Sequence, residues 1–202
     1  LALSMKTLWS SAFIGRTVML WIAWFGIVFT YYGIFTWLPT LVYNQGFPII
    51  RTFEYVLIMT LAQMPGYFTA AWLVDKLGRK YTLSLFLSMT GFAAYFFGQS
   101  ATATEILCWG SMMSFFNLGA WGVIYTYTPE LYPTSIRAFG SGWAAGVGRM
   151  GGMLAPALVG FILECGYKMN VVFYMFTTVL VVVSLVILVM GIETKQKKLE
   201  QI

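Results

Sequence analysis

The sequence GWAAGVGRMGGMLAPALVGFIL, from Gly142 to Leu163, is long enough to cross a lipid bilayer and contains a single charged residue, Arg149. That residue lies about 15 Å from the basic end of the run at the helical rise, near the centre of a hydrocarbon core roughly 30 Å thick. A guanidinium at this depth is costly unless it faces a polar cavity or a partner. We therefore expect Arg149 either to cap carbonyl groups of a neighbouring helix or to bind an anion in a transport pathway.

The rest of the chain has the same membrane character. Of its 202 residues, 59% are hydrophobic and only 9% are charged, and the mean hydropathy is +0.78. A soluble domain carries about a quarter charged residues, so apolar surface must face lipid here. Runs of the roughly 20 residues that a spanning helix needs predict an all-α integral membrane protein with six transmembrane helices. The predicted spans are Thr17–Leu38, Phe53–Val74, Tyr81–Gly98, Ile106–Tyr127, Gly142–Leu163 and Val171–Met190.

The composition excludes most enzyme classes and cofactors. The chain contains no histidine, and its two cysteines, Cys108 and Cys165, lack the spacing of metal ligands. Zinc sites and Ser-His or Cys-His nucleophiles are therefore not expected, and the sequence has no Walker-type phosphate loop. The net charge of +5 comes from basic residues at the ends of apolar runs, not from a stripe that could bind nucleic acid. We expect no enzyme activity, no cofactor, no metal and no nucleic-acid partner.

Basic residues divide unevenly between the two sides of the membrane. The positive-inside rule makes the richer side cytoplasmic, and an even number of spans places both termini of this segment there. We expect residues 1–16 to be the tail of a cytoplasmic linker or a surface helix, 17–192 the six-helix domain, and 193–202 a cytoplasmic tail, in the plasma (inner) membrane. The cytoplasmic side holds Lys6, Arg16, Lys76, Arg79, Lys80, Arg137, Lys195, Lys197 and Lys198, and the outer side holds Arg51 and Lys168.

Three motifs at the cytoplasmic ends of spans carry a family resemblance. The loop AWLVDKLGRK, residues 71–80, resembles the G-x-x-x-D-[RK]-x-G-R-[RK] signature of the major facilitator superfamily, with Ala71 in place of the first glycine. ELYPTSIR, residues 130–137, resembles the E-x-[YF]-P-x-x-x-R signature of its sugar-porter and organic-ion branches, and ETK, residues 193–195, is similar to the end of the same half. The resemblance implies the second half of a twelve-helix fold, built from two inverted three-helix repeats. Its partners would be the lipid bilayer and an N-terminal six-helix half.

Five charged residues in or beside these motifs lie at the cytoplasmic ends of predicted helices. Ion pairs and helix-end contacts among them could close an inner gate and break when the cavity opens inward. The alternative is that they only anchor the topology, since surface ion pairs are individually weak. The predicted gate residues are Asp75, Arg79, Glu130, Arg137 and Glu193.

The resemblance also implies a half-site for substrate on the first, second, fourth and fifth spans. FTYYG, residues 29–33, is similar to the F-x-Y-Y-G of organic-anion transporters, and the fifth-span arginine follows Glu130 by nineteen residues, as the anion-binding arginine does there. On the fourth span, an asparagine and two aromatic residues recur at i, i+4 and i+8, which predicts one helix face. The predicted substrate-binding residues are Tyr31, Tyr32, Gln63, Asn117, Trp121, Tyr125 and Arg149.

The chemistry of this half-site favours a small aromatic carboxylate. A guanidinium in a low-dielectric cavity binds a carboxylate bidentately, and tyrosine and tryptophan offer flat, amphipathic walls for a ring. Two segments, residues 53–68 and 114–122, resemble bacterial niacin transporters, which implies nicotinate as the organic anion. No acid lies in the middle of a span, so a carboxylate for proton symport would belong to the other half, with uniport as the alternative.

Two other functions stay open from the sequence. A porter for a sugar or another metabolite would have the same fold, although sugar sites are richer in amide side chains than this half is. A membrane protein could also keep the fold for receptor or regulatory work without transport, as synaptic vesicle glycoproteins of this superfamily are thought to do. The short predicted outer loops leave little room for a ligand-recognition domain.

Overall fold

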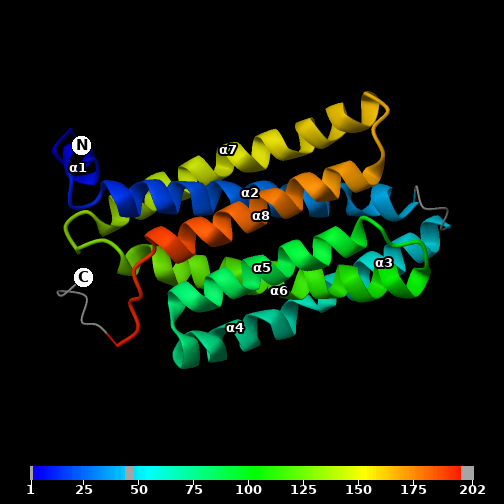
Figure 1. The fold of residues 1–202 in the computed structure, drawn as a ribbon, viewed down its shortest axis with the longest axis horizontal. Helices are drawn as coiled ribbons and strands as arrows, with labels where there is room; N and C mark the ends of the chain where they lie inside the picture. The colour runs from blue at the N-terminus through cyan, green and yellow to red at the C-terminus, as the bar shows by residue number, and fades with distance from the viewer. Residues whose placement is uncertain (1, 44–47, 197–202) are drawn as a thin grey trace.

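The computed structural model describes residues 2–43 and 48–196 as a bundle of α-helices, and this part of the chain contains no β-strand (Figure 1). The expectation of an all-α fold is confirmed. Residues 197–202 of the expected tail, among them Lys197 and Lys198, lie outside the described residues. The helices are α1 (Ala2–Leu8), α2 (Ile14–Tyr43), α3 (Ile49–Leu61), α4 (Gln63–Leu77), α5 (Arg79–Phe97), α6 (Ala103–Glu130), α7 (Arg137–Glu164) and α8 (Met169–Met190).

Six segments of this bundle have the length of a membrane span. Five of them are also apolar enough by mean hydropathy: α2, α3 with α4, α6, α7 and α8. The sixth is α5, whose first two residues are Arg79 and Lys80, and these charges lower its mean hydropathy. Because α5 packs along α6 and α8 inside the bundle, it completes a six-helix half of the fold.

The second predicted span differs from expectation because it is interrupted. The length of the apolar run predicts one span over 53–74, whereas the structure has α3 and α4 separated at Ala62. Pro65 explains the break: it has no N–H to donate to the carbonyl of Leu61, and its ring crowds that carbonyl. In contrast, α7 runs through Pro156 without interruption, where the Nε1 of Trp37 donates to the Pro156 carbonyl at 3.1 Å.

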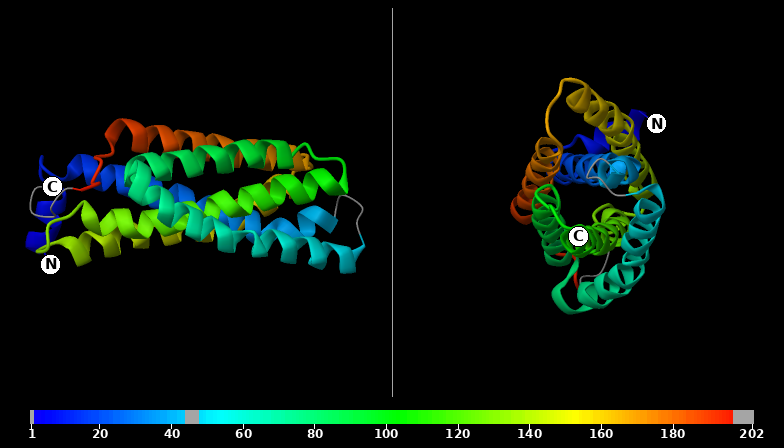
Figure 2. Two further views of the ribbon diagram at one scale, coloured as in Figure 1. Left: turned by 90° about the horizontal axis from the view of Figure 1, so that it is seen from below. Right: turned by 90° about the vertical axis from the view of Figure 1, so that its right-hand side faces the viewer.

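The helices form an elongated bundle with α7 at one edge and α4 at the other (Figures 1 and 2). Between them, α2 packs against α7 and α8, and α6 packs against α4 and α5. In the most apolar part of α2, 61% of the residues are buried, compared with 22% in the α3–α4 span and in α7. The two edges therefore leave most of their surface free for lipid or for further protein.

Both described ends of the chain lie at one end of the bundle (Figure 1). We call it the basic end; it comprises α1, the α4–α5 turn, the α6–α7 loop and residues 191–196. The first spanning helix starts there at Ile14, three residues before the predicted start, and Thr17 Oγ1 donates to the carbonyl of Leu8 at 3.2 Å. The basic residues at this end are Lys6, Arg16, Lys76, Arg79, Lys80, Arg137 and Lys195, whereas Arg51 and Lys168 lie at the other end.

Glycines set the closest helix contacts, and Gly66 provides a test. A Cβ at this position would collide with the backbone carbonyl of Phe115 on α6, which cannot move without shifting the helix. Gly66→Ala is expected to lower the free energy of unfolding by about 2 kcal/mol, a shift of roughly 5 °C in thermal unfolding. Gly15→Ala is the control, because a Cβ there meets no atom within 4 Å; equal melting temperatures for the two variants would contradict the packing argument.

Candidate functional site

The side chain of Arg149, on α7, reaches toward α2. Its Nη1 donates to the hydroxyl of Tyr32 at 3.5 Å, and the side chain is exposed. Glycine at position 152, one turn along α7, leaves room for Tyr32, because a Cβ there would lie only 3.0 Å from the Tyr32 ring. Among the described residues, Arg149 pairs with no carboxylate and caps no backbone carbonyl. Its guanidinium therefore keeps most of its donors for another acceptor.

Four of the predicted aromatic residues form a continuous wall next to this arginine. The Trp121 ring of α6 lies 4.8 Å from that of Tyr31 and 6.5 Å from that of Tyr32, both on α2. Tyr125 continues the wall at 6.3 Å from Trp121. We call these four rings the aromatic wall; the structure brings them together from two helices that are far apart in the sequence.

Tyr67 of α4 belongs beside this wall and is not among the residues predicted from the sequence. A Cβ at Gly122 of α6 would lie 2.9 Å from the Tyr67 ring, so glycine lets the ring approach the α6 backbone. Its position one turn after Gln63 is the only sequence signal that could have indicated it.

The two predicted amide side chains lie deeper than the aromatic wall. Asn117 is 1% exposed, and both its Oδ1 and its Nδ2 lack a hydrogen-bond partner among the described residues. Tyr125, eight residues later, is 49% exposed. Positions i, i+4 and i+8 drift by about 80° around an α-helix, which turns Asn117 inward and Tyr125 outward. Gln63 is buried as well, at 7% exposed.

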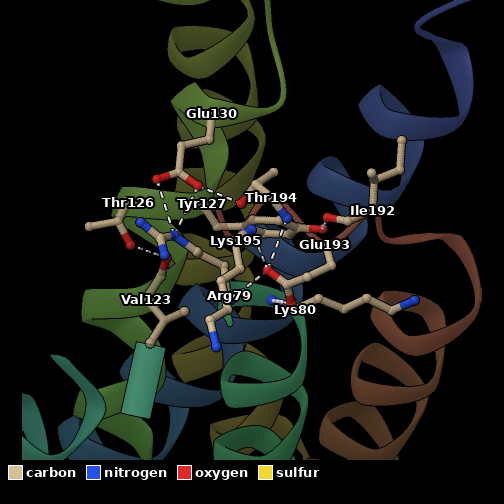
Figure 3. Close-up of polar contacts among 10 residues, drawn as sticks. All are labelled: Arg79, Lys80, Val123, Thr126, Tyr127, Glu130, Ile192, Glu193, Thr194 and Lys195. Carbon is tan, nitrogen blue, oxygen red and sulfur yellow. Dashed lines mark hydrogen bonds and ion pairs between the residues drawn. The ribbon is translucent and has the colours of Figure 1, made fainter. Parts of the chain in front are cut away.

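An ion cluster at the basic end joins α5, α6 and the segment after α8 (Figure 3). The Nε of Arg79 donates to both carboxylate oxygens of Glu130, at 3.0 and 3.2 Å. The Thr194 hydroxyl donates to Oε2 of the same carboxylate. Each side chain of the ion pair is only about one-fifth exposed, at 23% and 22%, so the pair is shielded more than a surface pair.

Glu193 caps the start of α5 from a distant part of the chain (Figure 3). Its carboxylate accepts from the backbone N–H of Arg79 at 3.0 Å and of Lys80 at 3.1 Å. A carboxylate at a helix N-terminus satisfies free N–H groups and complements the helix dipole. Gly78 makes room for this contact: its φ is +95°, and a Cβ there would collide with the Glu193 carboxylate.

The other two predicted gate residues lie outside this ion cluster. Asp75 is exposed and has no ion pair in the described part of the chain, and Arg137 donates through Nε to the carbonyl of Tyr132 at 3.2 Å. The Tyr132 hydroxyl in turn donates to Thr17 Oγ1 at 3.0 Å. Burial raises the pKa of Tyr132.

A cavity of about 560 Å³ between α4 and α6 extends from Tyr67 to the ion cluster. It is lined at one end by Tyr67 and at the other by Asp75, Arg79 and Glu130. Within the described ranges, no group of three or more acidic, cysteine or histidine side chains could hold a metal. The described part of the site is a set of aromatic rings and fixed charges.

The fold and the motifs place the chain in a family of membrane transporters. The family model described as Major Facilitator Superfamily matches residues 55–201, and the chain belongs to this superfamily. The niacin transporter NiaP of Acinetobacter baylyi is 57% identical over 98% of this chain and 45% of its own length. A protein of Bacillus subtilis whose name is "Putative niacin/nicotinamide transporter NiaP" is 51% identical over 98% of this chain and 49% of its own length.

A plant relative extends the range of similar proteins. Organic cation/carnitine transporter 7 of Arabidopsis thaliana is 31% identical over 97% of this chain and 41% of its own length. The chain thus spans about half the length of the curated relatives it matches. The predicted superfamily and the similarity to bacterial niacin transporters are both confirmed, and the relatives are named as transporters, not as enzymes.

Proposed function

We propose that this chain forms half of a secondary transporter that moves a small aromatic carboxylate, such as nicotinate, across the plasma membrane. The observation that carries the proposal is the position of Arg149 beside Tyr32 and the aromatic wall, with no carboxylate of its own to neutralise it. A carboxylate ligand would satisfy the guanidinium, and its ring would lie against tyrosine and tryptophan faces. The similarity to proteins named for niacin transport supports the same substrate.

Alternating access would open and close the ion cluster at the basic end. We take this end as cytoplasmic because seven of its described residues are basic, compared with two at the other end. In the conformation described, Glu130 and Glu193 hold α5, α6 and the segment after α8 together. Breaking these contacts would let the cavity between α4 and α6 open to the cytoplasm. The remaining transmembrane helices would supply the opposite wall and the residue for any proton coupling.

Uptake of labelled nicotinate tests this proposal. Cells that express the protein from its complete gene should accumulate nicotinate, and excess benzoate should compete because it keeps the ring and the carboxylate. Nicotinamide, which has the same ring but no charge, should compete at least about tenfold less well if the guanidinium selects the carboxylate. Competition by sugars with none by benzoate would contradict the carboxylate site and favour a sugar porter.

A further inference from the structure

Trp24 of α2 and Thr128 of α6 form a buried hydrogen bond next to the aromatic wall. The Nε1 of Trp24 donates to the Thr128 hydroxyl at 2.8 Å, and that hydroxyl donates to the backbone carbonyl of Ile124 at 2.7 Å. Trp24 is 4% exposed and Thr128 is 1% exposed. Because the hydroxyl uses its proton within α6 and accepts from α2, the bond fixes the orientation of the Trp24 ring. We call these two residues the Trp24–Thr128 pair.

The backbone of a third helix packs against Trp24. A Cβ at Gly148 of α7 would lie 3.1 Å from the backbone oxygen of Trp24 and 3.3 Å from Cε3 of its ring. Glycine at this position therefore lets α7 approach Trp24 closely. The hydrogen bond to α6 and the contact with α7 together hold the ring in place.

Trp24 contacts one member of the aromatic wall, Tyr125. The centroids of the two rings lie 4.9 Å apart, and their planes are at 80°, an edge-to-face arrangement that aromatic pairs favour. Tyr125 is half-exposed, whereas Trp24 is almost fully buried. A ligand at the wall can therefore touch Tyr125, and Trp24 can influence that ligand only through the Tyr125 ring.

The Tyr125 ring has space in which to turn away from the wall. A cavity of about 420 Å³ between α2, α6 and α7 is lined by Tyr125 together with Trp24 and Thr128. Exposed side chains change rotamer within nanoseconds, so a half-exposed tyrosine beside such a cavity needs a contact that favours one orientation. The edge-to-face contact with Trp24 provides it. The orientation of Tyr125 thus depends on a ring that is itself held by Thr128.

We propose that the Trp24–Thr128 pair positions Tyr125 in the aromatic wall and thereby sets the affinity of the site for ring-bearing carboxylates. This inference rests on the proposed function. The pair lies on the same helix faces as the wall, since Tyr31 follows Trp24 by seven residues and Thr128 follows Trp121 by seven. Seven residues are two helical turns, or about 10 Å. The pair therefore forms the next layer of the bundle and acts on the wall from outside the ligand site.

Thr128→Val tests the proposal because it keeps the shape of the side chain and removes the acceptor. The Trp24 N–H would then be buried without its partner, so the ring should shift and release Tyr125. In cells that express the protein from its complete gene, KM for nicotinate uptake should rise about fivefold, with the maximal rate per transporter within about twofold of wild type. Thr128→Ser keeps the hydroxyl and should keep the wild-type KM.

Double variants decide whether the pair acts through Tyr125. In a Tyr125→Ala background, measured over a wider range of nicotinate concentration, Thr128→Val should change KM by less than about twofold. Trp24→Phe keeps a ring without the N–H and should match Thr128→Val, and combining the two should add nothing because each breaks the same bond. Thr90→Val is the matched control: Thr90 on α5 is also buried, and its hydroxyl donates to the carbonyl of Phe86 in its own helix. Its KM should equal that of wild type.

Other results would overturn the inference in distinct ways. Equal KM values for wild type and Thr128→Val would mean that the hydrogen bond has no effect on the substrate, while the proposed function would stand. An undiminished rise in KM in the Tyr125→Ala background would mean that the pair acts on another part of the site. Lower thermal stability and maximal rate at unchanged KM would make the pair a packing contact. Wild-type protein that carries no nicotinate would remove the proposed function and this inference together.

Discussion

Replacing Arg149 with alanine is expected to abolish nicotinate uptake, with a fall of at least about a hundredfold in kcat/KM. The reason is that the substrate carboxylate would lose its charged partner in a low-dielectric site, where a charge-assisted hydrogen bond is worth about 1.5–3 kcal/mol and a bidentate pair more. Arg149→Lys keeps the charge but not the fork of donors, so we expect it to recover less than about a tenth of the activity. The measurement is initial uptake rate against nicotinate concentration, normalised to protein in the membrane.

Tyr32→Phe is the matched control for this prediction. It removes the hydroxyl that accepts from Arg149 at 3.5 Å and keeps the aromatic ring. If the guanidinium serves the substrate, this variant should raise KM by only about threefold, since a long neutral hydrogen bond contributes little. Normal uptake by Arg149→Ala, at normal expression, would mean that the arginine is structural and that the anion site lies elsewhere.

Gly78→Ala is expected to remove most transport and to destabilise the protein. Alanine at φ +95° is strained by about 1–2 kcal/mol, and its Cβ would also push away the Glu193 carboxylate. Displacing that carboxylate would leave the N–H groups at the start of α5 without their acceptor. We expect thermal unfolding to fall by roughly 8 °C, from a total cost of about 3 kcal/mol. Thermal unfolding in detergent and nicotinate uptake would be measured together.

Gly166→Ala separates the two costs of the Gly78 substitution. Gly166 has φ +81°, so alanine meets a similar backbone strain, but a Cβ there contacts no atom within 4 Å. Gly166→Ala should therefore lose only the strain part of the stability and keep its uptake. If Gly78→Ala and Gly166→Ala lose the same stability and the same uptake, the contact between Gly78 and Glu193 contributes nothing beyond backbone conformation. That result would argue against the role proposed for the ion cluster in transport.

The helical membrane architecture could be predicted from the sequence because lipid permits few alternatives. Long apolar runs must satisfy their backbone groups internally, so composition and run length indicate spanning helices even for α5, which begins with two charges. The break at Ala62 could not be placed with the same rule. A proline within an apolar run can break or kink a helix, yet Pro156 stands inside the continuous helix α7. A proline in the sequence therefore does not by itself indicate that a helix is interrupted.

The candidate site could be predicted only in part, because sequence spacing describes one helix at a time. The i, i+4 spacing on α6 predicts one face, and the Trp121 and Tyr125 rings do lie 6.3 Å apart, but the drift of about 80° over eight residues turns Asn117 inward. Tyr67 joined the wall because Gly122 on a different helix left space for its ring. Thr194 stands in the ETK motif, but the motif does not indicate its contact with Glu130, which depends on the path of the chain after α8.

The cap on α5 has a consequence for biosynthesis. The N–H group of Arg79 leaves the ribosome 114 residues before Glu193, the carboxylate that accepts from it. Until Glu193 has been synthesised, water at the membrane surface must accept hydrogen bonds from the N–H groups of Arg79 and Lys80. The α4–α5 turn lacks its contact with Glu193 during that time. Insertion of these helices and closure of the basic end are thus separate events, and a chain arrested before residue 193 would contain α2 to α8 but not the contact of Glu193 with α5. Nascent chains of increasing length, probed by proteolysis at the α4–α5 turn, would record when this contact forms.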